Sequence, residues 1–457
     1  MIVTNGPDFP YHPAEGEKRA RTDRYPPPPL PKAPDNSSTP QARISVGEAT
    51  LGATGPVLKV VVTPRVHLTQ PPSNEGRLPK PPLEALPPPD SPPSPLCSLN
   101  PTLAAVAVGP NPSRVEVACL DPLADPSWDR MLLEFPEANC FHTAGWARVL
   151  HESYGYRPRY FASRRDGRIA ALLPVMEVSS WLTGSRGVSL PFTDCCEALL
   201  APGEDDRALV TAACRHAQEA GWNYFELRND VAAKPEAGAL RYFTHRLALD
   251  LEEEVLWAGL DSSVRRAVRK ARDSGATLRT ASDPASLATF YRLHCQTRKR
   301  LGVPPQPIRF FEKIRCHLLE QGLATMFIAS HGGETIAASI FLHFGGQVMF
   351  KYGASDPHYQ QLRPNNLIMW EAIRTFAAEG RRDLHMGRNE ADNPGLRRYK
   401  LSWGCREGLL GYRRFCPREG VFTQGKNPQQ GWHHAAFRRI PVPLARLVGS
   451  AIYPHMA

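Results

Sequence analysis

Cysteine and histidine are present in this sequence of 457 residues, but not in arrangements that bind metals. None of the ten cysteines forms a Cys-x-x-Cys pair, the adjacent Cys195 and Cys196 lack ligand spacing, and His433 and His434 have no partner residues nearby. No stretch reaches the ~18 to 20 apolar residues of a membrane span, and the first thirty residues contain no apolar signal-peptide core. We therefore expect a cytoplasmic protein with reduced thiols and no metal.

Proline, in contrast, dominates the first quarter of the chain. Residues 1–110 contain 25 of the 46 prolines, several of them in unbroken runs such as residues 26–29. Because proline lacks an amide donor and has a fixed φ, such runs form neither helices nor sheet ladders. We expect residues 1–110 to be a disordered segment in front of the folded part of the chain.

Positive charge is in excess, with a net charge of +10, which favours polyanionic partners such as nucleic acid, nucleotide-linked intermediates or an anionic membrane. Residues 261–275 (DSSVRRAVRKARDSG) have apolar residues at helical spacing and five cations on the other face. Among these cations, Arg265, Arg269 and Lys270 are candidate phosphate ligands. A solvated helix face explains the charges equally well.

The chain repeats itself at a period of roughly 160 residues, which indicates a duplicated domain rather than a solenoid. Residues 159–175 and 324–342 both contain a β-rich run that ends in Ala-Ser, a turn with glycine, and a second run that begins with Ile-Ala-Ala. Each predicts a β-hairpin. Downstream, each copy has an amphipathic helix that stops at a glycine, Gly221 or Gly380, and then a strand that ends in Arg-Asn.

The second copy is the more complete one. It predicts helices at 284–300, 309–321 and 367–379 and strands at 324–330, 335–344, 348–354, 383–386 and 409–415. This order describes the α/β (α+β) fold of GNAT acetyltransferases, with a mixed, mainly antiparallel central sheet flanked by helices. We predict tandem GNAT-like domains at 111–255 and 283–418, a basic linker helix at 256–282 and a basic tail at 419–457.

Candidate ligand-binding residues follow the central strands of the second copy. Residues 351–370 run from a strand that contains Tyr352 to Asn365 and Asn366, where helix-start amides attract anions, although helix capping is the commoner role of such asparagines. The glycine-rich loop expected for coenzyme A (CoA) binding is missing here. Arg388 and Asn389 end the next strand, where ligands of such sheets usually bind.

Tyr399 and Lys400 lie among aromatic residues, and a lysine in such a place is more often a surface residue than a catalytic one. For a general base the sequence offers only Asp356 and Glu371, for which turn capping and helix-surface solvation are the commoner roles.

Several segments resemble the Fem-type aminoacyltransferases and their BioF2-like acetyltransferase relatives. They are residues 298–311 (RKRLGVPPQPIRFF), 351–373 (KYGASDPHYQQLRPNNLIMWEAI), 385–389 (HMGRN), 396–404 (LRRYKLSWG) and, in the first copy, 189–192 (SLPF). The resemblance implies two acetyltransferase-like domains and acyl transfer. It also implies that an aromatic-Lys pair, here Tyr399 and Lys400, contacts donor phosphates and stabilises charge at the acyl centre. Well-known members transfer amino acids from aminoacyl-tRNA to peptidoglycan precursors, and other relatives are linked to exopolysaccharide loci.

The predicted function is therefore N-acyl or aminoacyl transfer to an amine of a phosphate-bearing cell-envelope or polysaccharide precursor. The donor would be aminoacyl-tRNA or acyl-CoA, held by the second copy, while the first copy forms a wall of the acceptor cleft. The alternatives are an acyl-CoA-dependent N-acetyltransferase acting on a sugar or lipid, and a non-catalytic anion- or nucleic-acid-binding adaptor. Replacing Lys400 with Ala should abolish transfer and leave the thermal melt nearly unchanged.

The tail from Trp432 to Ala457 is basic and apolar, which would suit peripheral contact with the inner face of an anionic membrane. Pro441 and Pro443 are expected to break the helix that such contact needs. Packing of the tail against the catalytic domains is therefore the preferred expectation.

Overall fold

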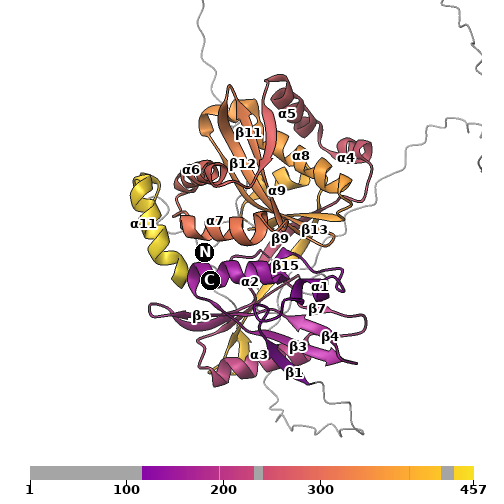
Figure 1. Cartoon of the computed structure of the whole chain (residues 1–457), viewed down its shortest axis with the longest axis vertical. Coiled ribbons are helices and arrows are strands. Elements are labelled where there is room, and N and C mark those ends of the chain that lie inside the picture. The colour runs from indigo at the N-terminus through magenta and orange to yellow at the C-terminus, as the bar shows by residue number, and fades with distance from the viewer. Residues whose placement is uncertain (1–115, 195, 231–239, 391, 424–436, 457) are drawn as a thin grey trace, which may run out of the picture. The chain divides into compact units, whose positions relative to one another are not determined.

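A computed structural model describes residues 116–194, 196–230, 240–390, 392–423 and 437–456 (Figure 1). The predictions for residues 1–110, for Cys195 and for His433 and His434 fall outside these ranges. The described residues belong to one compact unit.

The second half of the chain contains the predicted helices and strands in the predicted order, together with α4, β10, η3, α9 and β16, which the sequence did not predict. These are α4 (Glu253–Gly259), α5 (Ser262–Asp273), β10 (Thr277–Ala281), α6 (Pro284–Leu301), α7 (Ile308–Ile314), the π-helical turn η2 (Arg315–Leu319), β11 (Ala324–His331), β12 (Glu334–Phe344), β13 (Gln347–Ser355), the 3₁₀ helix η3 (Pro357–Leu362), α8 (Pro364–Ala378), β14 (Asp383–Asn389), α9 (Pro394–Leu401), β15 (Arg406–Cys416) and β16 (Val421–Thr423). The α6 boundaries follow local chemistry. The Asp283 side chain accepts from Ser286 N, and Gly302 ends the helix with a left-handed φ of 74°.

The strands of this half form a sheet in the order β10-β11-β12-β13-β14. All pairs are antiparallel except β13 and β14, which are parallel and pair only through residues 347–349 and 383–385. Helices α6 and α7 lie on one side of the sheet, whereas α8, with α5 packed against it, covers the other (Figure 1). The predicted mixed sheet flanked by helices is confirmed.

The first half repeats part of this plan. It contains β1 (Val117–Leu120), α1 (Trp128–Leu132), the 3₁₀ helix η1 (Cys140–His142), α2 (Ala144–Tyr154), β2 (Arg157–Pro158), β3 (Tyr160–Arg165), β4 (Arg168–Leu173), β5 (Met176–Ser180), β6 (Gly184–Val188), β7 (Leu199–Leu200), α3 (Arg207–Glu219), β8 (Phe225–Asp230) and β9 (Leu240–Ala248). The hairpin of β3 and β4 and the sequence α3-β8 are the repeated features that the sequence predicts.

The two halves exchange strands. Strand β9 of the first half pairs with β14 of the second half, and β15 of the second half pairs with both β9 and β8. One sheet therefore runs from β13 through β14, β9 and β15 to β8 and β6. Dividing the chain into two parts at any residue between β9 and β15 would therefore separate strands that are paired in this sheet.

The hydrophobic core also joins the halves. Trp146 on α2 packs edge-on against Phe310 on α7, with 6.1 Å between ring centroids. Tyr154, at the end of α2, stacks on the same Phe310 at 5.5 Å. These ring contacts and the exchanged strands hold the first half against the second half.

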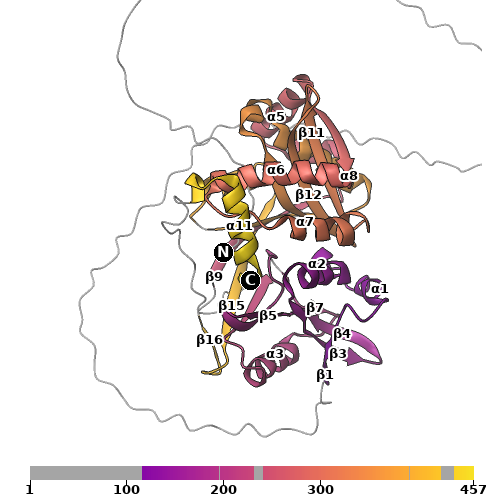
Figure 2. The same ribbon diagram turned by 60° about the vertical axis from the view of Figure 1, so that its left-hand side comes forward.

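The C-terminal segment forms the helix α11 (Val442–Ile452) and the 3₁₀ turn η4 (Tyr453–His455) (Figure 2). The expectation that Pro441 and Pro443 break a helix here is wrong. Pro441 is the N-cap residue and Pro443 lies in the first turn, where the helix needs no amide donor. No helix in the described part of the chain is long and apolar enough to cross a membrane.

The C-terminal segment packs against both halves, as the sequence predicts. Arg298 Nη2 on α6 donates to the Tyr453 hydroxyl oxygen at 2.8 Å, and Arg186 Nη2 on β6 donates to the His455 carbonyl oxygen at 2.7 Å. Gly449 lies so close to the Pro305 carbonyl that a Cβ atom at residue 449 would be 2.0 Å from that oxygen.

Candidate functional site

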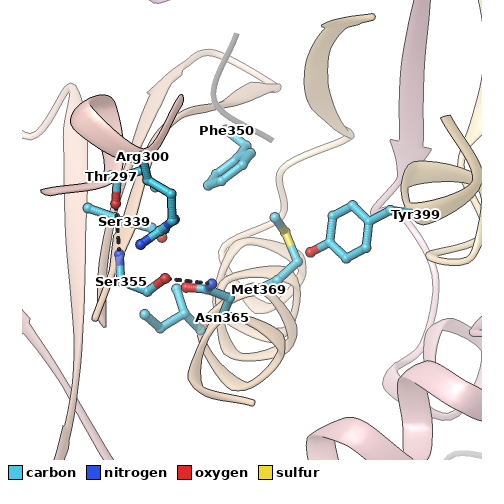
Figure 3. Close-up of a pocket in the computed structure, with 11 residues that line it drawn as sticks. Thr297, Arg300, Ser339, Phe350, Ser355, Asn365, Met369 and Tyr399 are labelled. Atoms are coloured by element: carbon cyan, nitrogen blue, oxygen red, sulfur yellow. Dashed lines mark hydrogen bonds between the residues drawn. The ribbon is translucent and has the colours of Figure 1, made fainter. Parts of the chain in front are cut away.

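A small pocket lies beside β13, beyond the residues that pair with β14. Figure 3 shows the side chains that line it. Its walls come from the end of α6, from β12 and β13, from the start of α8 and from α9. The lining residues are Thr297, Arg300, Ser339, Phe350, Gly353, Ala354, Ser355, Asn365, Ile368, Met369 and Tyr399. Beyond Met349, no described strand pairs with the β13 edge that faces β14.

Ser355 organises the polar wall of this pocket. Asn365 Nδ2 donates to Ser355 Oγ at 3.2 Å, and the Ser355 amide donates to Thr297 Oγ1 at 3.4 Å (Figure 3). Of the two asparagines predicted to bind ligand, Asn365 lines the pocket, whereas Asn366 is buried in the first turn of α8 and does not line it. Neither is the N-cap of α8, because Arg363 occupies that position with a left-handed φ of 59°.

The connection between β13 and α8 is the 3₁₀ helix η3, and its amides are bonded within the connection. The His358 amide donates to Asp356 Oδ1 at 2.9 Å, the Tyr359 amide to the Asp356 carbonyl and the Arg363 amide to the Gln360 carbonyl. These donors are therefore not presented to a phosphate. Asp356, a candidate base, acts here as a cap.

The other candidate base, Glu371, lies on α8. Its side chain accepts from Arg374 Nη1 at 3.1 Å in a partly exposed pair.

Helix α9 carries both Tyr399 and Lys400, and their side chains have different surroundings. Tyr399 lines the pocket and packs edge-on against Trp403, with 6.0 Å between centroids. Lys400 is only 2% exposed, so the interpretation as a surface lysine is wrong. Its Nζ donates to the carbonyl oxygens of Gly387 at 2.8 Å and Arg388 at 2.9 Å. Burial lowers the pKa of Lys400 to about 8.

Arg388 is buried at the junction of the exchanged strands. Its guanidinium lies over the rings of Tyr242 on β9, at 4.3 Å, and Tyr412 on β15, at 5.2 Å. The neighbouring Asn389 donates from Nδ2 to the Glu390 carbonyl at 2.8 Å. Within the part of the chain that the structure describes, Asn389 Oδ1 is buried without a hydrogen-bond partner.

Tyr352 is also buried, but it does not line the pocket. Its ring packs against Phe311 at 5.2 Å and His294 at 6.2 Å in the core that both halves share. Its hydroxyl group is buried and finds no hydrogen-bond partner among the described residues.

The predicted phosphate ligands of α5 do not line the pocket either. Arg265 Nη1 donates to the carbonyl oxygens of Leu260 at 2.7 Å and Ala258 at 2.9 Å, and so caps the end of α4. The Arg269 guanidinium lies 5.5 Å from the centre of the Trp257 ring. Lys270 is exposed. Structural contacts thus account for Arg265 and Arg269.

Two residues at the junction of the halves were missed by the sequence analysis. Asp194 from the first half, 2% exposed, accepts from Lys351 Nζ on β13 at 3.4 Å. Asp194 Oδ1 is buried and, among the described residues, has no hydrogen-bond partner. Burial lowers the pKa of Lys351, and the Asp194 carboxylate opposes this shift. The sequence did contain a signal for both residues, because Asp194 lies two residues after the SLPF segment and Lys351 interrupts an apolar strand.

Charged side chains of both signs are buried at the junction of the two halves. Among the side chains that the structure describes, they include the carboxylates of Asp194 and Glu226 and the cations of Arg228, Lys351, Arg388 and Lys400. Arg228 Nη2 pairs with Glu226 at 2.7 Å.

A second small cavity lies between the halves on the side where β13 and β14 are still paired. Its walls combine residues of the first half with residues of the central strands. They are Glu137, Asn139, Cys140, Phe141, Glu197, Arg246, Leu342, Gln347, Val348, Met349 and His385. Arg246 Nη2 donates to Glu197 Oε1 at 3.2 Å at this cavity. Burial lowers the pKa of His385 well below its usual value.

No group of three or more His, Cys, Asp or Glu side chains that could hold a metal ion occurs in the described ranges.

Comparisons with known proteins agree with this architecture. Residues 260–401 match the family model of the acetyltransferase (GNAT) domain. Among solved structures, FemX superposes with a TM-score of 0.53 at 16% identity, over 65% of this chain and 96% of FemX. A tandem GNAT protein from the clavulanic acid biosynthesis pathway has a TM-score of 0.43 at 14% identity, over 66% and 99% of the two chains. L-PGS from Bacillus licheniformis has a TM-score of 0.42 at 15% identity, over 72% and 98%. None of the curated proteins matches the sequence.

Proposed function

We propose that this chain, which combines a GNAT domain with the fold of the Fem-type proteins, is an N-acyltransferase. It would transfer an acyl or aminoacyl group to an amine of a phosphate-bearing cell-envelope or polysaccharide precursor. The observation that carries the proposal is the pocket where β13 and β14 separate, with Tyr399 in its wall. In proteins of this fold, the acyl donor lies where the central strands splay.

Direct attack of a primary amine on the acyl carbonyl accounts for this site without a protein nucleophile. Such a reaction needs the amine and the carbonyl to be juxtaposed, and it needs donors for the oxyanion that develops. The β13 edge beyond Met349 supplies backbone groups without a strand partner in the described chain, and these can hold the donor in an extended conformation.

Lys400 would contribute a positive charge near the acyl centre, at the end of β14. Its ammonium group holds the Gly387 and Arg388 carbonyls and fixes the strand end that borders the pocket. With a pKa of about 8, Lys400 is charged at neutral pH, so its field favours negative charge developing at the acyl centre. We assign Tyr399 to the donor pocket and Lys400 to charge stabilisation.

The junction of the halves would bind the acceptor. The second cavity has walls from both halves, and Arg246 in its wall would contact a phosphate group of the acceptor. Asp194 from the first half lines neither cavity, and it would act on the acceptor site by holding the Lys351 side chain of β13 in place. This assignment agrees with the expectation that the first half forms one wall of the acceptor cleft.

The donor class is a separate question, and the η3 connection favours aminoacyl-tRNA. Its amides are bonded internally and it contains no glycine, so a CoA pyrophosphate would lack the usual backbone cradle. The match of residues 260–401 to the GNAT family favours a second candidate, an acyl-CoA-dependent N-acetyltransferase acting on a sugar or lipid.

Calorimetry of the full chain against acetyl-CoA, a long-chain acyl-CoA and charged tRNA separates these candidates, with transfer of a radiolabelled aminoacyl group as the functional readout. We expect charged tRNA to bind and both CoA esters to bind weakly or not at all. Tight CoA binding would overturn the aminoacyl-tRNA donor, and binding of donors without any transfer would overturn the enzyme in favour of an adaptor.

A pair of variants locates the donor. Asn365→Ala removes a polar side chain from the pocket wall and should weaken donor binding by roughly tenfold, the value of one lost hydrogen bond. Gln361→Ala on the adjacent η3 removes an exposed amide outside the pocket and serves as the control. Equal effects of the two substitutions would contradict a donor site in this pocket.

A further inference from the structure

The outer face of α11 carries large apolar side chains that no described residue covers. Leu444 is 52% exposed and Leu447 is 68% exposed. The opposite face, with Ala445, Gly449 and the following Tyr453, is buried against the rest of the protein. The helix is therefore apolar on two sides, although it is packed on only one.

The turn between β5 and β6 continues this apolar surface. Trp181 is 86% exposed and Leu182 is 60% exposed. The Trp181 ring lies 5.4 Å from the ring of His455, just after α11, and Ser180 Oγ is 2.9 Å from His455 Nδ1. Both ribbon views show α11 and the end of β5 on the same side of the described fold (Figures 1 and 2). We call Trp181, Leu182, Leu444 and Leu447 the α11 patch.

The segment around the patch carries positive charges but no negative ones. Residues 437–456 include Arg438, Arg439 and Arg446, all exposed, and contain no aspartate or glutamate. An exposed tryptophan and leucines beside arginines are the composition of surfaces that insert at the headgroup level of anionic bilayers.

We propose that the α11 patch docks the protein on the surface of an anionic lipid bilayer. Leu444 and Leu447 would enter the boundary of headgroups and acyl chains, Trp181 would sit at the interface, and the arginines would bind lipid phosphates. At ~1.5 Å per residue the 11-residue helix is about 16 Å long, roughly half of the ~30 Å hydrocarbon thickness, so it lies in the plane of the surface.

The positive charge of residues 437–456 favours a bilayer over a second copy of the chain as the partner of the α11 patch. A symmetric dimer through this patch would bring the arginines of both copies together, with no carboxylate in residues 437–456 to compensate them. A bilayer that contains anionic lipid offers the opposite charge and an apolar layer in one partner.

The site would be held at the bilayer by the same segment. Because the residues after α11 bond to Arg298 in one half and to Arg186 in the other, docking through α11 fixes both halves relative to the lipid surface. The proposal does not depend on the identity of the donor or the acceptor.

Vesicle co-sedimentation of the full chain tests the proposal, with vesicles of phosphatidylcholine alone and of phosphatidylcholine mixed with phosphatidylglycerol. We expect binding to the mixed vesicles that weakens as salt rises, and a blue shift of tryptophan emission that Trp181→Phe reduces. Arg438→Gln/Arg439→Gln/Arg446→Gln should lower the partition coefficient by roughly 100-fold, and Leu444→Ser/Leu447→Ser by at least about tenfold.

Matched variants elsewhere on the surface are the controls. Leu133→Ser changes a leucine that is 61% exposed on the first half, and Arg130→Gln/Arg164→Gln/Arg168→Gln removes three exposed arginines far along the sequence from α11. No binding to the mixed vesicles, or equal loss in the patch and control variants, would overturn the proposal. Dimerisation that is abolished by the leucine variant, with no vesicle binding, would assign the patch to a second copy instead.

Discussion

The buried ammonium group of Lys400 makes a specific prediction about how stability depends on pH. Its pKa is 10.5 in the unfolded chain and about 8 in the folded protein, where burial disfavours the charged form. Between these two pH values the unfolded state binds more protons than the folded state, so the free energy of unfolding rises with pH in this window. The difference between the two pKa values corresponds to about 3 kcal/mol.

The substitution Lys400→Met removes this titration and keeps the volume of the side chain similar. Urea unfolding of the wild-type chain and the variant at pH 7, 9 and 10.5 measures the effect, because the contributions of all other groups are shared. We expect the stability difference in favour of the wild type to grow by about 3 kcal/mol from the lowest to the highest pH.

At pH 7 two opposing effects of the substitution remain. The carbonyl oxygens of Gly387 and Arg388 lose their donor, which costs ~1–3 kcal/mol each, while the cost of burying a charge disappears. We therefore no longer expect the thermal melt of a Lys400 variant to stay unchanged. Lys270→Met, at an exposed lysine, is the control. Parallel pH profiles of the wild type and Lys400→Met would refute the reasoning.

Three further predictions concern activity and packing. The transfer rate should fall as pH rises through about 8, because Lys400 loses its charge, and Lys400→Arg should move this fall to higher pH. Asp194→Asn should raise KM for the acceptor and destabilise the fold by about 3 kcal/mol, because the buried Lys351 charge loses its partner, and adding Lys351→Met should restore stability without restoring KM. Gly449→Ala should lower the melting temperature by several degrees, because its Cβ would clash with the Pro305 carbonyl oxygen; an unchanged melt would show that α11 contributes little to stability.

Local signals in the sequence were sufficient for most helices and hairpins of the second half. Asp283 and Pro284 at the start of α6 and Gly302 at its end fix the helix through capping and backbone geometry, which are properties of neighbouring residues. The repeat identified the two hairpins for the same reason. The likeness to FemX confirms the predicted fold.

Non-local contacts explain what the sequence did not predict. The pairing of β9 with β14 joins residues far apart in the chain, and its register depends on which other edges are free. Lys400 reads as a surface residue because its partners, the Gly387 and Arg388 carbonyls, become neighbours only when α9 folds back on β14. The prediction from Pro441 and Pro443 was wrong because proline breaks a helix that continues through it but is accepted where a helix begins.

Because of the strand exchange, some strands are synthesised long before the strands with which they pair. β9 is complete at Ala248, but its partner β14 begins only at Asp383, and β8 waits still longer for β15. At ~5–20 residues per second, the ~135 intervening residues leave the edge of β9 unpaired for roughly 7–27 s. Such edges invite pairing with other chains. The first half is therefore expected to be the aggregation-prone intermediate of synthesis, and chaperone contact should be densest while the second half is being made.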